Sequence, residues 1–140
     1  MSELGLVPAS INIFPQGRFH GEAVKERVYQ PDWSSFERLS YSLRAAEICA
    51  DFVAAAGGQR AVMSTVPLGF RGQGRDAAPS CDHVENIFRA ALALDELHAR
   101  SGVDIVLALE PEPWCLLETM AEAVAWFEDF ALPFAASHGN

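Results

Sequence analysis

Two glutamates stand where an apolar segment of the sequence ends. In the stretch VLALEPEPWCLLE, residues 106–118, Glu110 and Glu112 follow a run of apolar residues, and each of them precedes a proline. A strand end that only has to turn would use Gly, Asn or Asp. A carboxylate at the end of a buried strand needs a partner, because an unpaired buried charge is very costly. A divalent cation, an arginine or the hydroxyl groups of a substrate would each provide that partner.

The alternation of side chains predicts which way Glu110 points. Successive side chains of a strand face opposite sides, so residues 104–110 have one face with Val106, Ala108 and Glu110 and another with Ile105, Leu107 and Leu109. The bulkier face is expected to pack against helices. The smaller face, which ends in Glu110, is expected to line a barrel interior or a crevice.

Other polar side chains follow two further strand-like segments. Residues 10–14 (SINIF) precede a long loop with Arg18 and His20, and residues 60–66 (RAVMSTV) precede a loop with Arg71. The carboxyl ends of parallel strands meet at one edge of a sheet, where α/β proteins keep their binding sites. We therefore expect these side chains to lie near the two glutamates.

Structural roles for the same residues remain open. Glu110 could form a salt bridge with Arg18 or Arg71 that only stabilises the fold. Glu112, between two prolines, could be solvated, and His20 could be a hydrogen-bonded loop residue. The sequence alone does not choose between these roles and ligand binding.

Helical patterns follow each predicted strand. Capping signals and glycine or proline stops predict three helices: Ser34 to Gly57, Ser80 to Gly102, and Trp114 to Pro133. The third has an apolar stripe, expected to face the core, at Leu117, Met120, Val124 and Phe127. The repeated order of strand, loop and helix predicts an α/β fold of three consecutive βα units with a parallel sheet.

Composition sets broader limits. The chain has 140 residues, which fits a single domain over residues 1–140, and a formal charge of −9. That charge argues against nucleic acid or an anionic membrane surface as a partner, and no apolar run is long enough for a membrane span. Three cysteines without CxxC spacing are expected to be free thiols, so the predicted location is the cytoplasm.

Three segments together resemble a known family. INIFPQGRFHGEAVKERVYQPDW, STVPLGF and LALEPEPWCLLET are similar to successive strand-end segments of the EboE-type metabolite-traffic proteins. These belong to the xylose-isomerase-like TIM-barrel superfamily, together with sugar-phosphate isomerases and epimerases. The resemblance covers roughly residues 10 to 130 and implies a (β/α)₈ barrel fold.

The resemblance also implies roles for individual residues. A divalent metal (manganese, zinc or magnesium) would be held at the carboxyl ends of the strands by Glu110 and Glu112. His20 would act with Glu110 in catalysis, and Arg18 and Arg71 would bind an anionic group of a small-molecule metabolite.

The number of strands limits these expectations. A (β/α)₈ barrel has eight strands and about 250 residues, whereas three βα units are predicted here, so the chain is expected to form a partial barrel that binds metal weakly. It would be part of a metal-dependent isomerase or epimerase, a non-catalytic metabolite-binding module, or an inactive truncated barrel. Because three strands cannot close a barrel, we expect self-association or a complementary half-barrel as partner.

Overall fold

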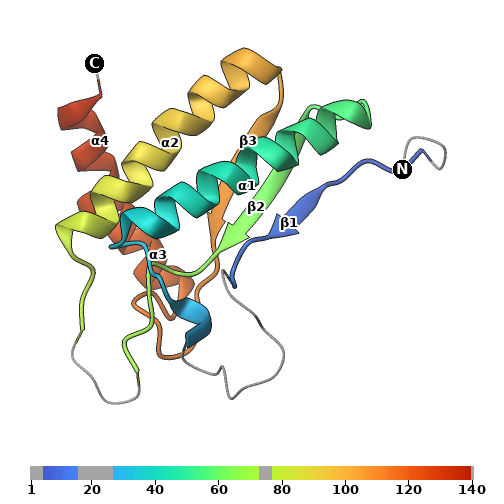
Figure 1. Ribbon diagram of the computed structural model, residues 1–140. Helices are drawn as coiled ribbons and strands as arrows, with labels where there is room; N and C mark the ends of the chain where they lie inside the picture. The colour runs from blue at the N-terminus through green and yellow to red at the C-terminus, as the bar shows by residue number, and fades with distance from the viewer. Residues whose placement is uncertain (1–4, 16–26, 73–76, 140) are drawn as a thin grey trace.

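The computed structural model describes residues 5–15, 27–72 and 77–139. In this part of the chain, three strands form one parallel sheet: β1 (Ser10–Asn12), β2 (Arg60–Thr65) and β3 (Asp104–Leu109). Their order in space, β1-β2-β3, follows their order in the sequence (Figure 1). The predicted α/β fold of three consecutive βα units with a parallel sheet, as in a partial TIM barrel, is confirmed.

Two long helices follow β1 and β2, with capping that differs in detail from the prediction. Helix α1 (Phe36–Ala55) begins after Ser35, whose side chain accepts a hydrogen bond from the Glu37 N–H; the N-cap is therefore one residue later than predicted. Helix α2 (Cys81–Ser101) begins with a capping box between Ser80, the predicted start of this helix, and His83. It ends at Gly102, whose φ of 71° is the left-handed conformation that favours glycine.

Both helices pack on the same face of the sheet. The register places Ala61 beside Ile105 and Met63 beside Leu107, so these side chains share one face. A buried cluster joins them to both helices: Ile13, Ala46, Cys49, Ala50, Val53, Ala61, Met63, Leu94, Leu97, Val103 and Ile105. Figure 1 shows α1 and α2 side by side over the sheet. The prediction that the bulkier face of β3 packs against helices is confirmed.

The opposite face of the sheet has no helix over it in the described residues. On this face, Val62 lies beside Val106 and Ser64 lies beside Ala108, and all four side chains are only half-buried. In a closed barrel this face would be the packed interior.

The third helical region departs from the prediction. It consists of α3 (Met120–Trp126), a π-helical turn η3 (Phe127–Ala131) and α4 (Leu132–His138). Pro133 does not end the helix: it lies in the first turn of α4, where the missing N–H of proline is not needed. The π-helical bond from the Leu132 N–H to the Phe127 carbonyl lets the chain continue into this turn.

The predicted core stripe of this region is also wrong in part. Met120 and Val124 are 68% and 50% exposed, whereas Ala123 and Trp126 are buried. Thr119 caps the helix, so the helix starts later than predicted and is rotated to turn Ala123 and Trp126 inward. No helix in the described ranges has the length and apolar character needed to cross a membrane.

Candidate functional site

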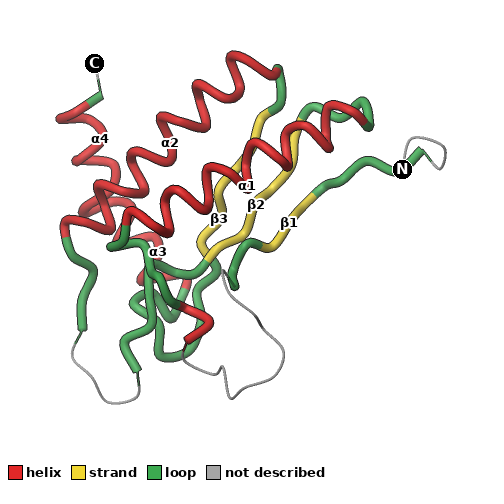
Figure 2. The backbone as a smooth tube through the Cα atoms, in the orientation of Figure 1, coloured by secondary structure: helices red, strands yellow, loops and turns green. Residues whose placement is uncertain are grey.

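A pocket of about 530 Å³ opens at the carboxyl ends of the strands. We call it the mouth pocket. It is lined by the end of β1, the short helix η2 (Arg27–Tyr29) and the segment after β3: Asn12, Phe14, Pro15, Val28, Tyr29, Glu110 and Glu112. The connecting segments converge at this end of the sheet (Figure 2). The structure therefore brings the two predicted glutamates to the predicted edge of the sheet.

Glu110 is held by the backbone pairing of the sheet. Its N–H donates to the Thr65 carbonyl at 3.1 Å and extends the pairing of β2 and β3 by one residue. Alternation continues through this position, so its half-buried carboxylate lies on the face of Val106 and Ala108, away from the helices. This is the predicted orientation of Glu110, and it lets the side chain line the mouth pocket.

Glu112 is fixed by a tyrosine that the sequence did not single out. The hydroxyl of Tyr29 donates to Oε2 of Glu112 at 2.8 Å. The Tyr29 ring stacks on Phe70 with centroids 4.8 Å apart and meets the edge of Phe14 at 5.1 Å. Burial, and then the hydrogen bond to Glu112, raise the pKa of Tyr29. Tyr29 is therefore a neutral donor at physiological pH, and Glu112 is a fixed acceptor.

Backbone hydrogen bonds join the segment after β3 to the segment after β2. The Leu116 N–H donates to the Gly69 carbonyl at 2.8 Å, and the Arg71 N–H donates to the Trp114 carbonyl at 3.0 Å. Phe70 and Cys115 form an isolated antiparallel bridge between the same segments. The prolines around Glu112 restrict the backbone further. The pocket wall that contains the glutamates is thus supported by a second loop.

Arg71 forms an ion pair with Glu118, and both side chains are about 70% buried, at 29% and 27% exposure. Arg71 does not line the mouth pocket, so its predicted role in substrate binding remains a prediction. Among the described residues, Arg71 forms its ion pair with the third glutamate of the segment and not with Glu110, the open alternative. Arg18 and His20 lie outside the described residues, and their predicted roles remain predictions.

Arg38 is a second residue that the sequence analysis missed. Its guanidinium is fully buried and donates to three backbone carbonyls: Pro31 at 2.6 Å, Ile13 at 3.2 Å and Phe14 at 3.0 Å. Arg38 thereby joins the end of β1 to the segment between η2 and α1. The only sign of this role in the sequence is the position of Arg38 beside Leu39, on the buried side of a predicted helix.

The described part of the site does not complete a metal centre. No group of three or more His, Cys, Asp or Glu side chains is placed to hold a metal within residues 5–15, 27–72 and 77–139. Glu110 and Glu112 line one pocket, but Glu112 already accepts a hydrogen bond from Tyr29. Hard cations need more oxygen ligands than this pair provides. The donors described do not fit a full divalent site.

Cys115 lies behind the pocket wall and does not act as a nucleophile at neutral pH. The thiol is fully buried, and burial raises its pKa to about 11. A thiol is reactive as its thiolate. The described lining of the mouth pocket therefore offers hydrogen-bond donors and carboxylate acceptors.

No protein-family model and no curated protein matches this chain. Among solved structures, the crystal structure of an N-terminally His-tagged D-allulose 3-epimerase from Methylomonas sp. is similar at a TM-score of 0.49 and 15% sequence identity. The similarity covers 91% of this chain and 50% of that one, so the chain spans about half the length of the epimerase structure. A likeness at this level does not extend to substrate, metal or reaction.

Proposed function

We propose that this chain is part of a xylose-isomerase-like barrel protein and that its mouth pocket binds a small polyhydroxylated metabolite. The observation that carries the proposal is the position of the pocket at the carboxyl ends of the parallel strands, with two glutamates, an asparagine and a tyrosine in its lining. Open α/β sheets bind their ligands at this end. The EboE-type resemblance of the three strand-end segments points to the same superfamily.

The chemistry of the lining suits hydroxyl groups. Glu110 offers carboxylate oxygens that accept hydrogen bonds from hydroxyls, and Glu112 is held in place by Tyr29. The side-chain oxygen of Asn12, Oδ1, accepts a hydrogen bond from the Phe14 N–H at 2.7 Å. This bond fixes the side-chain amide and leaves its NH₂ group as the donor. Phe14, Pro15 and Val28 supply apolar surface for the carbon skeleton of a sugar. A polyol needs this mixture of acceptors, donors and apolar contacts.

Binding is the function that the described residues support best, and isomerisation or epimerisation is the alternative. Proton transfer next to a sugar carbonyl needs a base and a group that stabilises the developing oxyanion. Glu110 is a candidate base, and the oxyanion donor would be the Asn12 NH₂ group, Arg18, His20 or a group of a partner chain. We propose that divalent metal binding by this chain alone is weak.

Titration of D-allulose, followed by saturation-transfer NMR, tests the proposed function. Glu110→Gln should weaken binding about tenfold, because a hydrogen bond to a charged acceptor contributes roughly 1.5 kcal/mol or more over its neutral counterpart. The matched control is Glu128→Gln, which removes the same charge from an exposed position on η3 outside the pocket. Equal binding by all three proteins, or no binding of this probe and of D-fructose, would refute a sugar site at Glu110.

Incubation in D₂O separates the two candidate functions. An isomerase or epimerase would introduce deuterium beside the carbonyl of D-allulose, and Glu110→Gln would abolish the exchange. A binding module would bind the sugar without exchange. Exchange that persists in the variant would exclude Glu110 as the base.

A further inference from the structure

The outer edge of β3 is an unpaired strand edge. At the two ends of β3, the N–H groups of Asp104 and Glu110 donate to β2-side carbonyls at 2.8 and 3.1 Å. In a parallel pair, bonding alternates between the two sides of a strand, so the backbone groups of Ile105, Leu107 and Leu109 face away from β2. No described strand pairs with that side, since β3 ends the order β1-β2-β3. Free edges of this kind invite another strand.

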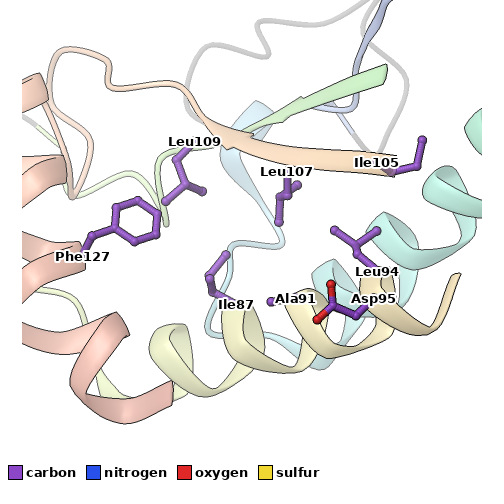
Figure 3. A pocket seen from close by; sticks show the side chains of 8 residues that line it. All are labelled: Ile87, Ala91, Leu94, Asp95, Ile105, Leu107, Leu109 and Phe127. Atoms are coloured by element: carbon purple, nitrogen blue, oxygen red, sulfur yellow. The ribbon is translucent and has the colours of Figure 1, made fainter. Parts of the chain in front are cut away.

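An apolar groove of about 250 Å³ runs beside this edge. We call it the edge groove; its lining is Ile87, Ala91, Leu94, Asp95, Ile105, Leu107, Leu109 and Phe127. Figure 3 shows Leu107 and Leu109 pointing into the space between β3 and α2, with Ile105 at the other end of β3 and Phe127 closing the far side near Leu109. The residues with free backbone groups therefore also supply the wall of the groove. A strand added here would gain backbone hydrogen bonds and side-chain burial together.

The charges around the groove are acidic. Asp95 is the charged residue of the lining, and it lies toward the Ile105 end. It is exposed, and none of the ion pairs between described residues includes it. Glu128 and Asp129 are exposed directly after Phe127. The whole chain has a formal charge of −9. A basic occupant is complementary to this surface, and an acidic one is repelled.

The same charges disfavour a second copy of the chain at this edge. Antiparallel pairing of two β3 strands about a two-fold axis at Leu107 would align their apolar faces. It would also place Asp104 of one copy opposite Glu110 of the other at both ends, and like charges directly opposite are destabilising. Asp104 pairs with Arg60 at 3.3 Å, but both side chains are about half exposed or more, and such bridges contribute little.

We propose that the β3 edge and the edge groove bind an extended strand of a different, basic partner chain. This strand alternates apolar side chains into the groove and places a lysine or arginine beside Asp95. It continues the sheet beyond β3 and covers the exposed apolar side of Phe127. The partner is thus a complementary β-containing chain with a positive charge at the strand end.

A short fluorescein-labelled peptide with the sequence KTVTVTVTK provides the probe, with fluorescence anisotropy on the full chain as readout. Asp95→Lys should weaken its binding about threefold to tenfold, since reversal replaces an exposed attraction with a repulsion. The matched control is Glu96→Lys, the same charge change at the next residue of α2, which lines a different surface near Arg100. It should leave the affinity within about twofold.

The acidic peptide ETVTVTVTE completes the design. It should bind the wild-type chain more weakly than KTVTVTVTK, and Asp95→Lys should reverse this preference. Absence of peptide binding, or an equal loss with Glu96→Lys, would overturn the proposal. Sedimentation of the wild-type chain as a dimer that the basic peptide does not dissociate would also overturn it, in favour of a second copy at this edge.

Discussion

Replacing Tyr29 with phenylalanine removes one hydroxyl and leaves the ring contacts in place. The variant loses the 2.8 Å hydrogen bond to Glu112 and retains the stacking on Phe70 and the edge contact with Phe14. A hydrogen bond to a charged group contributes roughly 1.5–3 kcal/mol when buried. Both side chains here are half-buried, so we expect Tyr29→Phe to lower the free energy of unfolding by about 1 kcal/mol. For a chain of this size that corresponds to a melting temperature about 4 °C lower.

The stabilisation that the Tyr29 hydroxyl provides should decrease at high pH. The pKa of Tyr29 is raised in the folded chain above its ordinary value of 10.0, by burial first and by Glu112 second. The unfolded chain therefore loses the phenolic proton first as the pH increases. The contribution of Tyr29 to stability is fully present below about pH 10 and decreases as the pH rises further. The difference between wild type and variant should be constant from pH 7 to 9 and smaller above pH 10.

Urea denaturation followed by circular dichroism measures both quantities. The matched control is Tyr41→Phe, which removes a hydroxyl bonded to the neutral Pro15 carbonyl at 3.1 Å; its expected cost is about 0.5–1 kcal/mol. A double-mutant cycle with Glu112→Ala, which removes the acceptor, isolates the pair itself. The reasoning would be refuted if Tyr29→Phe left the free energy of unfolding unchanged at pH 7, or if the two substitutions were additive.

Three further outcomes follow from the described contacts. Arg38→Met should destabilise the chain by about 3 kcal/mol or more, because it leaves three carbonyls without a donor. The control Arg44→Met, at an exposed position, should cost under about 0.5 kcal/mol. Urea denaturation measures both losses, and losses of similar size would contradict the role of Arg38. Dithiobis(nitrobenzoate) at pH 8 should react quickly with the exposed Cys81 and only after unfolding with Cys115; a fast phase that persists in Cys81→Ser would be the contrary result. Calorimetry with Mn²⁺ should show weak binding that Glu110→Ala removes, and tight binding that survives this change would exclude Glu110 as a ligand.

The sequence predicted the parallel sheet and the position of the glutamates because those features depend on local pattern. The alternation in residues 104–110 fixes which side chains share a face, and the order of strand, loop and helix fixes the parallel pairing. Glu110 follows directly from the end of β3, since its place is set by the same alternation and by one more backbone hydrogen bond, to Thr65.

The third helical region shows where local pattern failed. Its stripe of Met120, Val124 and Phe127 has helical spacing, yet Ala123 and Trp126 occupy the core. When apolar residues surround a helix, more than one of its faces could pack against the core. Packing against neighbouring elements then selects one of these faces. Pro133 does not end the helix, because the π-helical turn before it places it in a first helical turn, and no local pattern of the sequence predicts that turn.

By itself the sequence determined the strands, their direction and the edge at which Glu110 and Glu112 stand, because period and chain order decide these. Only the tertiary structure decided the partners of the charged groups. Glu112 bonds to Tyr29, 83 residues away in the chain, and Arg71 pairs with Glu118, 47 residues away. Arg38 likewise reaches the carbonyls of Ile13 and Phe14 across the fold. Such contacts depend on which loops the folded chain brings together, and no local spacing encodes that choice.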